Sequence, residues 1–314
     1  MVWNQERQEK SVNGMKVVVT VNETYIYPLK VMLHSLFSTQ KEPVEVFLIH
    51  SGLSSGQVGE LRRFCTGYRQ EFSEVQVEND VFEKAPVMGY FSKEMYYRIL
   101  TPWLLPGEDR VLYLDPDIIV NDSLGSFFHM NLGKDAMAAV RDRPYAQIDH
   151  RKRLGLGEDA VYVNSGVILM DLKKMREKKS VEEVRRLLEE RGKEMIFPDQ
   201  DIINIMWEGY IRQMPDAYNL NPNILYLKEY LQMPMPQKAR KMGKIVHYMG
   251  KSKPWNKGYM GGLYLFWGKA EWHVSPGRRA GILGRILLCP VRFVYGLYLF
   301  YRNHDWKGKR RRSA

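Results

Sequence analysis

The chain has 314 residues, 45% of them hydrophobic and 26% charged, which is the ordinary composition of a globular protein. This length allows one large α/β domain or two smaller ones, with a core that needs no disulfide or structural metal. The net charge of +11 is concentrated at one end, because residues 278–314 hold ten Lys and Arg against one Asp. The nearly neutral remainder offers no continuous basic groove, so we expect no nucleic-acid partner.

The start of the chain and its cysteines indicate the cellular setting. Residues 1–14 are polar and lack the apolar core of a signal peptide, so we interpret them as a polar leader ahead of the fold. Only Cys65 and Cys289 occur. So few cysteines without a secretion signal favour a reduced, cytoplasmic protein.

Short apolar strands alternate with helices over the first 115 residues. The predicted strands are 15–21, 44–50, 74–78 and 110–115, and the predicted helices are 27–37, 54–65 and 93–105. Serines at the start of 54–65 suit a helix cap, and Pro102 and Pro106 are expected to end the helix at 93–105. The alternation predicts an α/β fold, with a mixed, mostly parallel sheet flanked by helices on both faces.

The second half of the body has a less regular pattern. Strands are predicted at 135–141 and 162–172, and helices at 173–192, ended by Gly192, and at 197–209, with Asp199 as N-cap after Pro198. From about residue 215 the chain is rich in Pro, Met and Tyr and is expected to be irregular, until the short apolar strand "KIV" before His247. Residues 15–275 are predicted to form one domain.

Asp115 and Asp117 follow the apolar strand 110–115, at an end where parallel sheets bind their ligands. Alternate residues of an extended chain point the same way, so both carboxylates can reach one point. Pro116 cannot donate to a sheet ladder and marks the end of the strand. Two close carboxylates share a proton or a cation, and their hard oxygens suit Mg²⁺ or Mn²⁺ completed by substrate phosphates. A solvated pair of aspartates in a tight turn is the competing interpretation.

A second polar cluster follows the "KIV" strand. If His247 joined the two aspartates, its imidazole would favour Mn²⁺ over Mg²⁺. Gly250 allows close approach of the backbone to a ligand, and Lys251 and Lys253 offer cations to a phosphate. A single histidine is more often a surface or core residue, and it is the neighbouring glycine, lysines and Trp that indicate a ligand site.

Four segments, in this order and spacing, carry a family resemblance: "YFSKEMYYRILTPWLLPGEDRVLYLDPDIIV", "VNSGVILMDL", "FPDQDIIN" and "HYMGKSKPW". Together they resemble glycosyltransferase family 8, which contains bacterial lipooligosaccharide galactosyltransferases and glycogenin, retaining enzymes with a Rossmann-like GT-A fold. The resemblance extends over roughly residues 15–260. It implies an Mn²⁺-dependent enzyme, with Mg²⁺ as an alternative, that moves galactose or glucose from a UDP-hexose donor to a saccharide or glycolipid acceptor in cell-surface polysaccharide synthesis.

The resemblance also implies roles around the metal and the phosphates. The metal ligands would be Asp115, Asp117 and His247, which would hold the ion on the donor diphosphate. The residues that bind the leaving phosphates would be Gly250 and Lys253.

The sugar and the nucleoside have their own implied contacts. Arg98 would contact the donor near its sugar and ribose. The residues at the sugar and acceptor hydroxyls would be Asp142, Asn164, Ser165, Asp199 and Gln200. The residues beside the nucleoside would be Thr20, Asn22 and Tyr25. Asn22 and Thr24 replace the aspartate and asparagine that the family places after its first strand, which bears on base selectivity.

Retention of anomeric configuration requires either a covalent intermediate or attack by the acceptor on the face that the leaving group departs from. The amide oxygen of Gln200 is weakly basic and therefore a poor nucleophile. We favour front-face attack, with a diphosphate oxygen accepting the proton of the acceptor hydroxyl.

Two other functions stay open at this point. One is a metal-dependent phosphatase of the haloacid-dehalogenase type with Asp115 as nucleophile, although that motif lies on the first strand and has Thr or Val where this chain has Ile119. The other is a catalytically silent, membrane-associated adaptor.

Residues 276–314 form a basic, apolar tail. Arg285 and Arg292 interrupt its apolar run, and an arginine at the centre of a membrane-spanning helix costs about 2.5–3.5 kcal/mol, so we predict no span. On a helix, Arg278, Arg285 and Arg292 would form one stripe beside an apolar surface. With the terminal "KGKRRR", this predicts peripheral association with the anionic inner face of the cell membrane. A C-terminal core helix with a disordered basic end is the alternative.

Overall fold

The computed structural model describes residues 14–77, 93–142, 144–220, 243–256, 259, 263–288, 291 and 294, with the side chains of 93 and 144–148 excepted. The strands of this part are β1 (Met15–Thr20), β2 (Val44–His50), β3 (Glu71–Gln76), β4 (Arg110–Leu114), β5 (Ile118–Val120), β6 (Met137–Arg141), β7 (Val163–Asp171), β8 (Ile211–Met214) and β9 (Ile245–His247). The α-helices are α1 (Ile26–Phe37), α2 (Ser55–Gly67), α3 (Tyr97–Leu104), α4 (Gly125–Phe128), α5 (Pro144–Leu154), α6 (Leu172–Lys178), α7 (Val181–Arg191), α8 (Pro198–Met206), α11 (Tyr264–Val274) and α12 (Arg279–Leu287).

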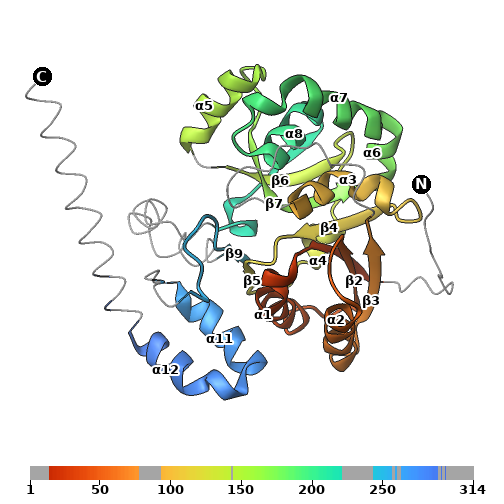
Figure 1. Ribbon diagram of the computed structural model, residues 1–314. Coiled ribbons are helices and arrows are strands. Elements are labelled where there is room, and N and C mark those ends of the chain that lie inside the picture. Colours follow the sequence, from red (N-terminus) through yellow and green to blue (C-terminus); the bar gives the residue numbers. More distant parts are fainter. Residues whose placement is uncertain are drawn as a thin grey trace, which may run out of the picture.

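A seven-stranded sheet in the order β3-β2-β1-β4-β7-β6-β8 forms the centre of the molecule (Figure 1). Strands β3, β2, β1 and β4 are parallel, β7 is antiparallel to both of its neighbours, and β8 is parallel to β6. The predicted mixed, mostly parallel sheet is therefore confirmed. A separate antiparallel pair, β5–β9, was not predicted, and it lies where the chain leaves β4.

The two faces of the sheet bury different sets of side chains because successive residues of a strand point to opposite sides. In β1, Val17 and Val19 join a core that contains residues of α1 and α2. Val18, between them, joins the opposite core with α3 and α8. Figure 1 shows helices on both sides of the sheet, as the alternation predicted.

The prediction of one helix over 173–192 is wrong. The chain forms α6 and α7 instead, with Lys179 extended between them. Ser180 caps α7, accepting from the backbone N–H of Glu183, while the Glu183 side chain accepts from the Ser180 N–H. This reciprocal capping box fixes a helix start at Ser180, where the charge pattern alone indicated continuity.

Two prolines and one strand also differ from expectation. Pro102 lies inside α3 rather than ending it. Arg176 of α6 donates to the carbonyl oxygens of Pro102, Leu105 and Glu108, and so supplies hydrogen-bond donors at and just beyond the C-terminal end of α3. Pro198 is the first residue of α8, so Phe197 is the N-cap and Asp199 lies within the first turn. The third strand covers 71–76 rather than 74–78.

The C-terminal helices α11 and α12 pack against each other and, through α11, against α1 (Figure 1). Arg278 and Arg285 of the predicted stripe contact the protein, since their guanidinium groups lie over the rings of Tyr27 and Tyr264 at 5.0 and 4.2 Å. Arg292 lies outside the described residues. The region also exposes large apolar side chains, 48–69% accessible: Leu283, Leu287, Leu288, Val291 and Val294. Among the described helices, none combines the length and the apolar character needed to cross a membrane.

Candidate functional site

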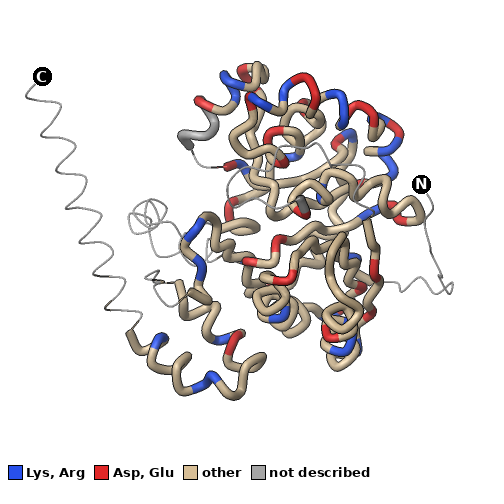
Figure 2. Tube along the Cα trace, in the orientation of Figure 1, with Lys and Arg blue, Asp and Glu red and all other residues tan. Residues whose placement is uncertain are grey.

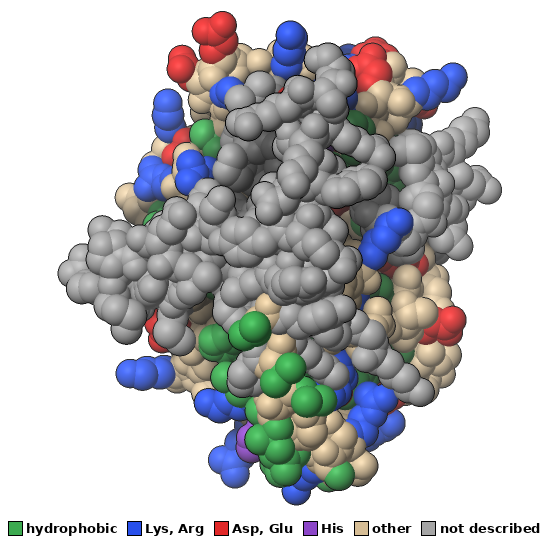
Figure 3. Space-filling model, turned by 90° about the vertical axis from the view of Figure 1, so that its left-hand side faces the viewer, with side chains coloured by type: hydrophobic (Ala, Val, Ile, Leu, Met, Phe, Trp, Pro, Cys, Tyr) green, Lys and Arg blue, Asp and Glu red, His purple; other side chains and the backbone are tan. Residues whose placement is uncertain are grey.

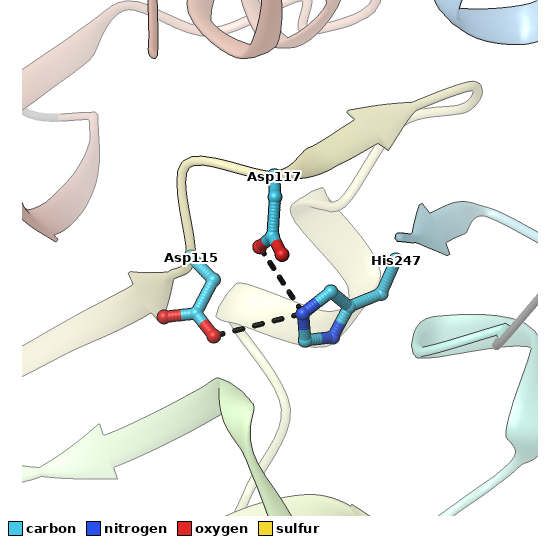
Figure 4. A group of neighbouring side chains, drawn as sticks. All are labelled: Asp115, Asp117 and His247. Carbon is cyan, nitrogen blue, oxygen red and sulfur yellow. Dashed lines mark ion pairs between the residues drawn. The ribbon is translucent and has the colours of Figure 1, made fainter. Parts of the chain in front are cut away.

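Asp115, Asp117 and His247 converge beyond the end of β4 (Figure 4). Asp115 directly follows β4, Asp117 directly precedes β5, and the pairing of Ile118 with His247 places the imidazole opposite them. The His247 Nε2 atom lies 3.2 Å from Asp117 Oδ1 and 3.6 Å from Asp115 Oδ2. Two hard carboxylates and one imidazole nitrogen, with ligand atoms within 4.8 Å of one another, are a donor set that Mn²⁺ or Mg²⁺ accepts.

The hydrogen bonds around His247 determine which ring nitrogen faces the carboxylates. The backbone N–H of Gly166 donates to Asn164 Oδ1, so the amide nitrogen of Asn219 must donate to that same oxygen. Asn219 Oδ1 is therefore an acceptor, and His247 Nδ1–H donates to it at 2.9 Å. With its Nδ1 proton held by Asn219, the ring has Nε2 directed at the aspartates, so Nε2 is the nitrogen that would coordinate a metal held there.

Gly166 keeps this space open. A Cβ added there would lie 2.3 Å from His247 Cε1 and 2.5 Å from Asp115 Oδ2. Any other residue would therefore displace two of the three candidate ligands, and this explains the glycine in the "VNSG" segment.

Lys253 provides the nearest described cation to Asp117. Its Nζ donates to an oxygen of that carboxylate and, at 2.9 Å, to the carbonyl oxygen of Tyr248. Burial would raise the pKa of Asp117, but Lys253 and His247 outweigh burial and hold that pKa well below its usual range. Gly250, between Tyr248 and Lys253, has φ +82°, a conformation that favours glycine. The chain thus places the predicted phosphate-binding residues directly beside the candidate metal ligands.

Arg98 connects this cluster to the predicted sugar pocket. Its guanidinium lies 2.9 Å from Asp115 Oδ1 and 3.2 Å from Asp199 Oδ2, and it donates to the backbone and hydroxyl oxygens of Ser165. Ser165 Oγ also donates to Asp199. Burial is the main influence on Asp199 and raises the pKa of that carboxyl, although Arg98 opposes it.

The side chains predicted for the sugar pocket form one hydrogen-bonded chain. Gln200 Oε1 accepts from Asn164 Nδ2 at 2.9 Å and from the Ser165 N–H at 3.1 Å. Gln200 Nε2 donates to Asp142 Oδ2 at 2.8 Å. Through Asn164 and Asn219 the chain continues to His247, so the sugar pocket and the metal centre share one network.

On the predicted nucleoside side, the three residues make different contacts. Thr20 Oγ1 lies 3.0 Å from the hydroxyl of Tyr113, which in turn donates to Asp115 Oδ1. Asn22 Oδ1 accepts from the N–H and hydroxyl of Thr24, capping a short 3-10 helix. Tyr25 meets the ring of Trp255 edge-on at 5.8 Å between centroids. The predicted role of these residues in base binding stays a prediction.

Sequence reasoning missed Asn219, Tyr113 and Gly166 as parts of this site. Asn219 lies in an irregular stretch, and it reaches His247 because Leu220 forms an isolated bridge with Val246. Tyr113 resembles any large apolar strand residue, although its hydroxyl and the cation–π contact with Arg98 at 4.7 Å set it apart.

With this geometry in place, comparison with known proteins identifies the family. The family model described as glycosyl transferase family 8 matches residues 16–258. The chain belongs to glycosyltransferase family 8. Its relatives include lipopolysaccharide 1,2-glucosyltransferase of Escherichia coli K12, 26% identical over 77% of this chain and 73% of that protein. General stress protein A of Bacillus subtilis strain 168 is 25% identical over 77% of this chain and 87% of its own length.

The structure of this family 8 protein has the GT-A fold. Galactosyltransferase LgtC, solved in complex with donor and acceptor sugar analogues, superimposes with a TM-score of 0.72. That superposition covers 82% of this chain and 95% of LgtC at 23% sequence identity. The predicted family and fold are therefore confirmed, and family membership displaces the phosphatase alternative.

Proposed function

We propose that this family 8 member is a metal-dependent, retaining hexosyltransferase that moves galactose or glucose from a UDP-hexose to a saccharide or glycolipid acceptor in cell-surface polysaccharide synthesis. The observation that carries the proposal is the cluster of Asp115, Asp117 and His247 with Lys253 beside it at the end of β4. Ligands for a divalent metal beside a lysine suit a diphosphate. The metal would bind some of the phosphate oxygens, and the lysine ammonium would bind others. The lipopolysaccharide glucosyltransferase and LgtC relatives support the sugar and the class of acceptor.

Each of this chain's residues has a task in that reaction. A divalent ion held by the three ligands would neutralise charge on the diphosphate as the anomeric bond breaks. Lys253, on a turn beside the site, would exchange its contact with Asp117 for a phosphate oxygen and stabilise the departing UDP. Arg98, paired with Asp115 and Asp199, would hold both carboxylates in place beside the donor.

The hydrogen bonds of Gln200 support front-face attack. Its amide oxygen accepts from Asn164 and from the backbone of Ser165, and its amide nitrogen donates to Asp142. An oxygen engaged by two donors is a weaker nucleophile still, because both bonds withdraw electron density from it. Gln200 would then orient the sugar, and the proton of the acceptor hydroxyl would pass to the leaving diphosphate.

Intact-mass spectrometry with the donor tests this mechanism. Incubation with UDP-galactose or UDP-glucose and Mn²⁺ is expected to leave the protein mass unchanged, while the product keeps the α configuration of the donor by NMR. A hexose adduct located on Gln200 of the unaltered protein would contradict front-face attack. An inverted product would contradict the retaining assignment.

The exposed apolar surface of the C-terminal helices supports a peripheral position at the cytoplasmic face of the cell membrane, with residues 276–314 as the attachment. Figure 3 shows hydrophobic side chains gathered at the lower end of one face, with Lys and Arg around them. Leu265 of α11 and Leu283 and Leu287 of α12 are exposed. Over the body, by contrast, acidic and basic residues are interspersed (Figure 2). An apolar surface followed by a basic chain end suits an anionic bilayer.

Vesicle co-sedimentation of the full chain tests the membrane proposal. We expect binding to vesicles of phosphatidylcholine with phosphatidylglycerol, weakened by salt, and little binding to phosphatidylcholine alone. Leu287→Glu should reduce binding about tenfold or more, since it removes an exposed leucine that would enter the bilayer and adds a charge that anionic lipid repels. Ile196→Glu, at an exposed apolar residue far along the chain, serves as the control. Equal binding of both variants, or no preference for the anionic lipid, would contradict the proposal.

A further inference from the structure

The lysine beside the candidate metal centre lies on a tight turn. The N–H of Asn256 donates to the carbonyl oxygen of Lys253 at 3.0 Å, with Pro254 as the second residue of the turn. Proline suits that position because its ring fixes the backbone angle that the turn requires. The place of this turn therefore sets how far the Lys253 Nζ reaches toward Asp117 and the diphosphate position.

Helix α12 holds the same turn from outside. Arg285 donates through Nη2 to the carbonyl oxygens of Pro254 and, at 3.1 Å, of Asn256. Its guanidinium also lies over the ring of Tyr264 on α11, 4.2 Å from the centroid. Hydrogen bonds from an ionised donor are about twice as strong as neutral ones, so this contact is a substantial restraint on the turn.

Apolar contacts join the turn to the helix pair as well. The ring of Trp255, within the turn, packs on that of Trp267 of α11 with centroids 5.0 Å apart. Gly268 lets α12 come close to α11, since a Cβ at that position would lie 3.0 Å from Ile286 Cγ1. The pair α11–α12 lies beyond residue 258, where the family model ends.

We propose that Arg285 is a positioning residue of the donor site, which acts by holding the 253–256 turn so that Lys253 faces the metal–diphosphate position. This inference rests on the proposed function. It means that the C-terminal helices contribute to donor binding, and not only to membrane attachment. The apolar residues proposed to meet the bilayer, such as Leu283 and Leu287, lie on the same helix as Arg285, so membrane contact and the donor site are mechanically connected.

Arg285→Ala in the full chain tests the inference, with Arg279→Ala as the matched control. Arg279 lies on the same helix, but its described contacts are with Trp272 rather than with the turn. We expect Arg285→Ala to weaken UDP binding in the presence of Mn²⁺, and to raise the donor KM, about tenfold, with Arg279→Ala within about twofold of the unaltered protein. Arg285→Lys, which keeps a donor and the charge, should recover part of the loss.

A double-variant cycle with Lys253→Ala separates positioning from general destabilisation. If Arg285 acts through Lys253, Arg285→Ala should cost less than about twofold in UDP affinity once Lys253 is absent. Hydrogen exchange of the Asn256 amide, which reports the turn without any ligand, should rise in Arg285→Ala and not in Arg279→Ala.

Three results would overturn the inference. These are unchanged UDP affinity in Arg285→Ala, additive losses in the Lys253→Ala background, and exchange at the Asn256 amide that does not rise in Arg285→Ala. Absence of UDP binding by the unaltered protein and by Arg279→Ala would instead overturn the proposed function, and the positioning role with it. The unaltered protein thus distinguishes the two failures.

Discussion

Asp117→Asn is expected to reduce metal-dependent release of UDP from a UDP-hexose on the order of 10³-fold, while the protein stays folded. The substitution keeps the size of the side chain but removes the charge that faces both His247 Nε2 and the Lys253 ammonium. The metal centre would lose one of its two anionic ligands, and Lys253 would lose the partner that holds it in place. The measurement is UDP release with Mn²⁺, together with a thermal melt of the metal-free protein.

Asp122→Asn is the matched control for this variant. Asp122 lies five residues further along the same segment and is exposed, and it pairs with Lys244 rather than with the site. It should stay within about twofold of the unaltered protein, because exposed ion pairs contribute little. A folded Asp117→Asn protein that still released UDP at the unaltered rate would remove the metal centre from the mechanism.

Arg98→Met is expected to lower the free energy of unfolding by about 3–5 kcal/mol, because it leaves the buried Asp199 and the partly buried Asp115 without their shared cation. Arg98 is 8% exposed and pairs with both Asp115 and Asp199. Burial favours the neutral form of arginine, but the nearby aspartates outweigh it and raise the Arg98 pKa, so the group is charged at every accessible pH. Urea unfolding of the metal-free protein measures the loss.

Two further variants make the Arg98 experiment decisive. Arg185→Met removes an arginine whose described partner is an exposed glutamate one helical turn away, Glu182, and should cost less than about 1 kcal/mol. Adding Asp199→Asn to Arg98→Met removes one of the uncompensated charges and should recover roughly half of the loss. A cost for Arg98→Met as small as that of Arg185→Met would show that the aspartates do not depend on this guanidinium.

The sequence was sufficient to predict those parts of the site whose residues lie close together in the chain. The apolar strand before Asp115, the alternation that includes Asp117, and the glycine and lysine after His247 each lie within a few residues of one another. Those patterns sufficed for the sheet, its parallel half and the convergence of two aspartates at a strand end. The capping box at Ser180 was also present in the sequence and would have divided α6 from α7.

Contacts between segments far apart in the chain could not be predicted from the sequence. Asn219 orients His247 from 28 positions away, through a single bridge that no periodicity marks. Arg285 was expected in the arginine stripe of a helix lying on the membrane, yet it binds a turn 29 to 31 residues before it in the chain. Amphipathic patterning distinguishes polar from apolar faces of a helix, but an arginine face can pack on backbone carbonyls as well as face a membrane. Only the three-dimensional fold separates these cases.

The most direct test of the account is UDP release by the unaltered protein from a panel of UDP-sugars without acceptor, with Mn²⁺ or with EDTA. Slow hydrolysis of the donor needs the donor site and the metal but no knowledge of the acceptor. We expect release from UDP-galactose or UDP-glucose that depends on Mn²⁺ and disappears with EDTA. No release from any UDP-sugar, together with no binding of UDP, would contradict it and leave a GT-A fold serving as a catalytically silent, membrane-associated adaptor.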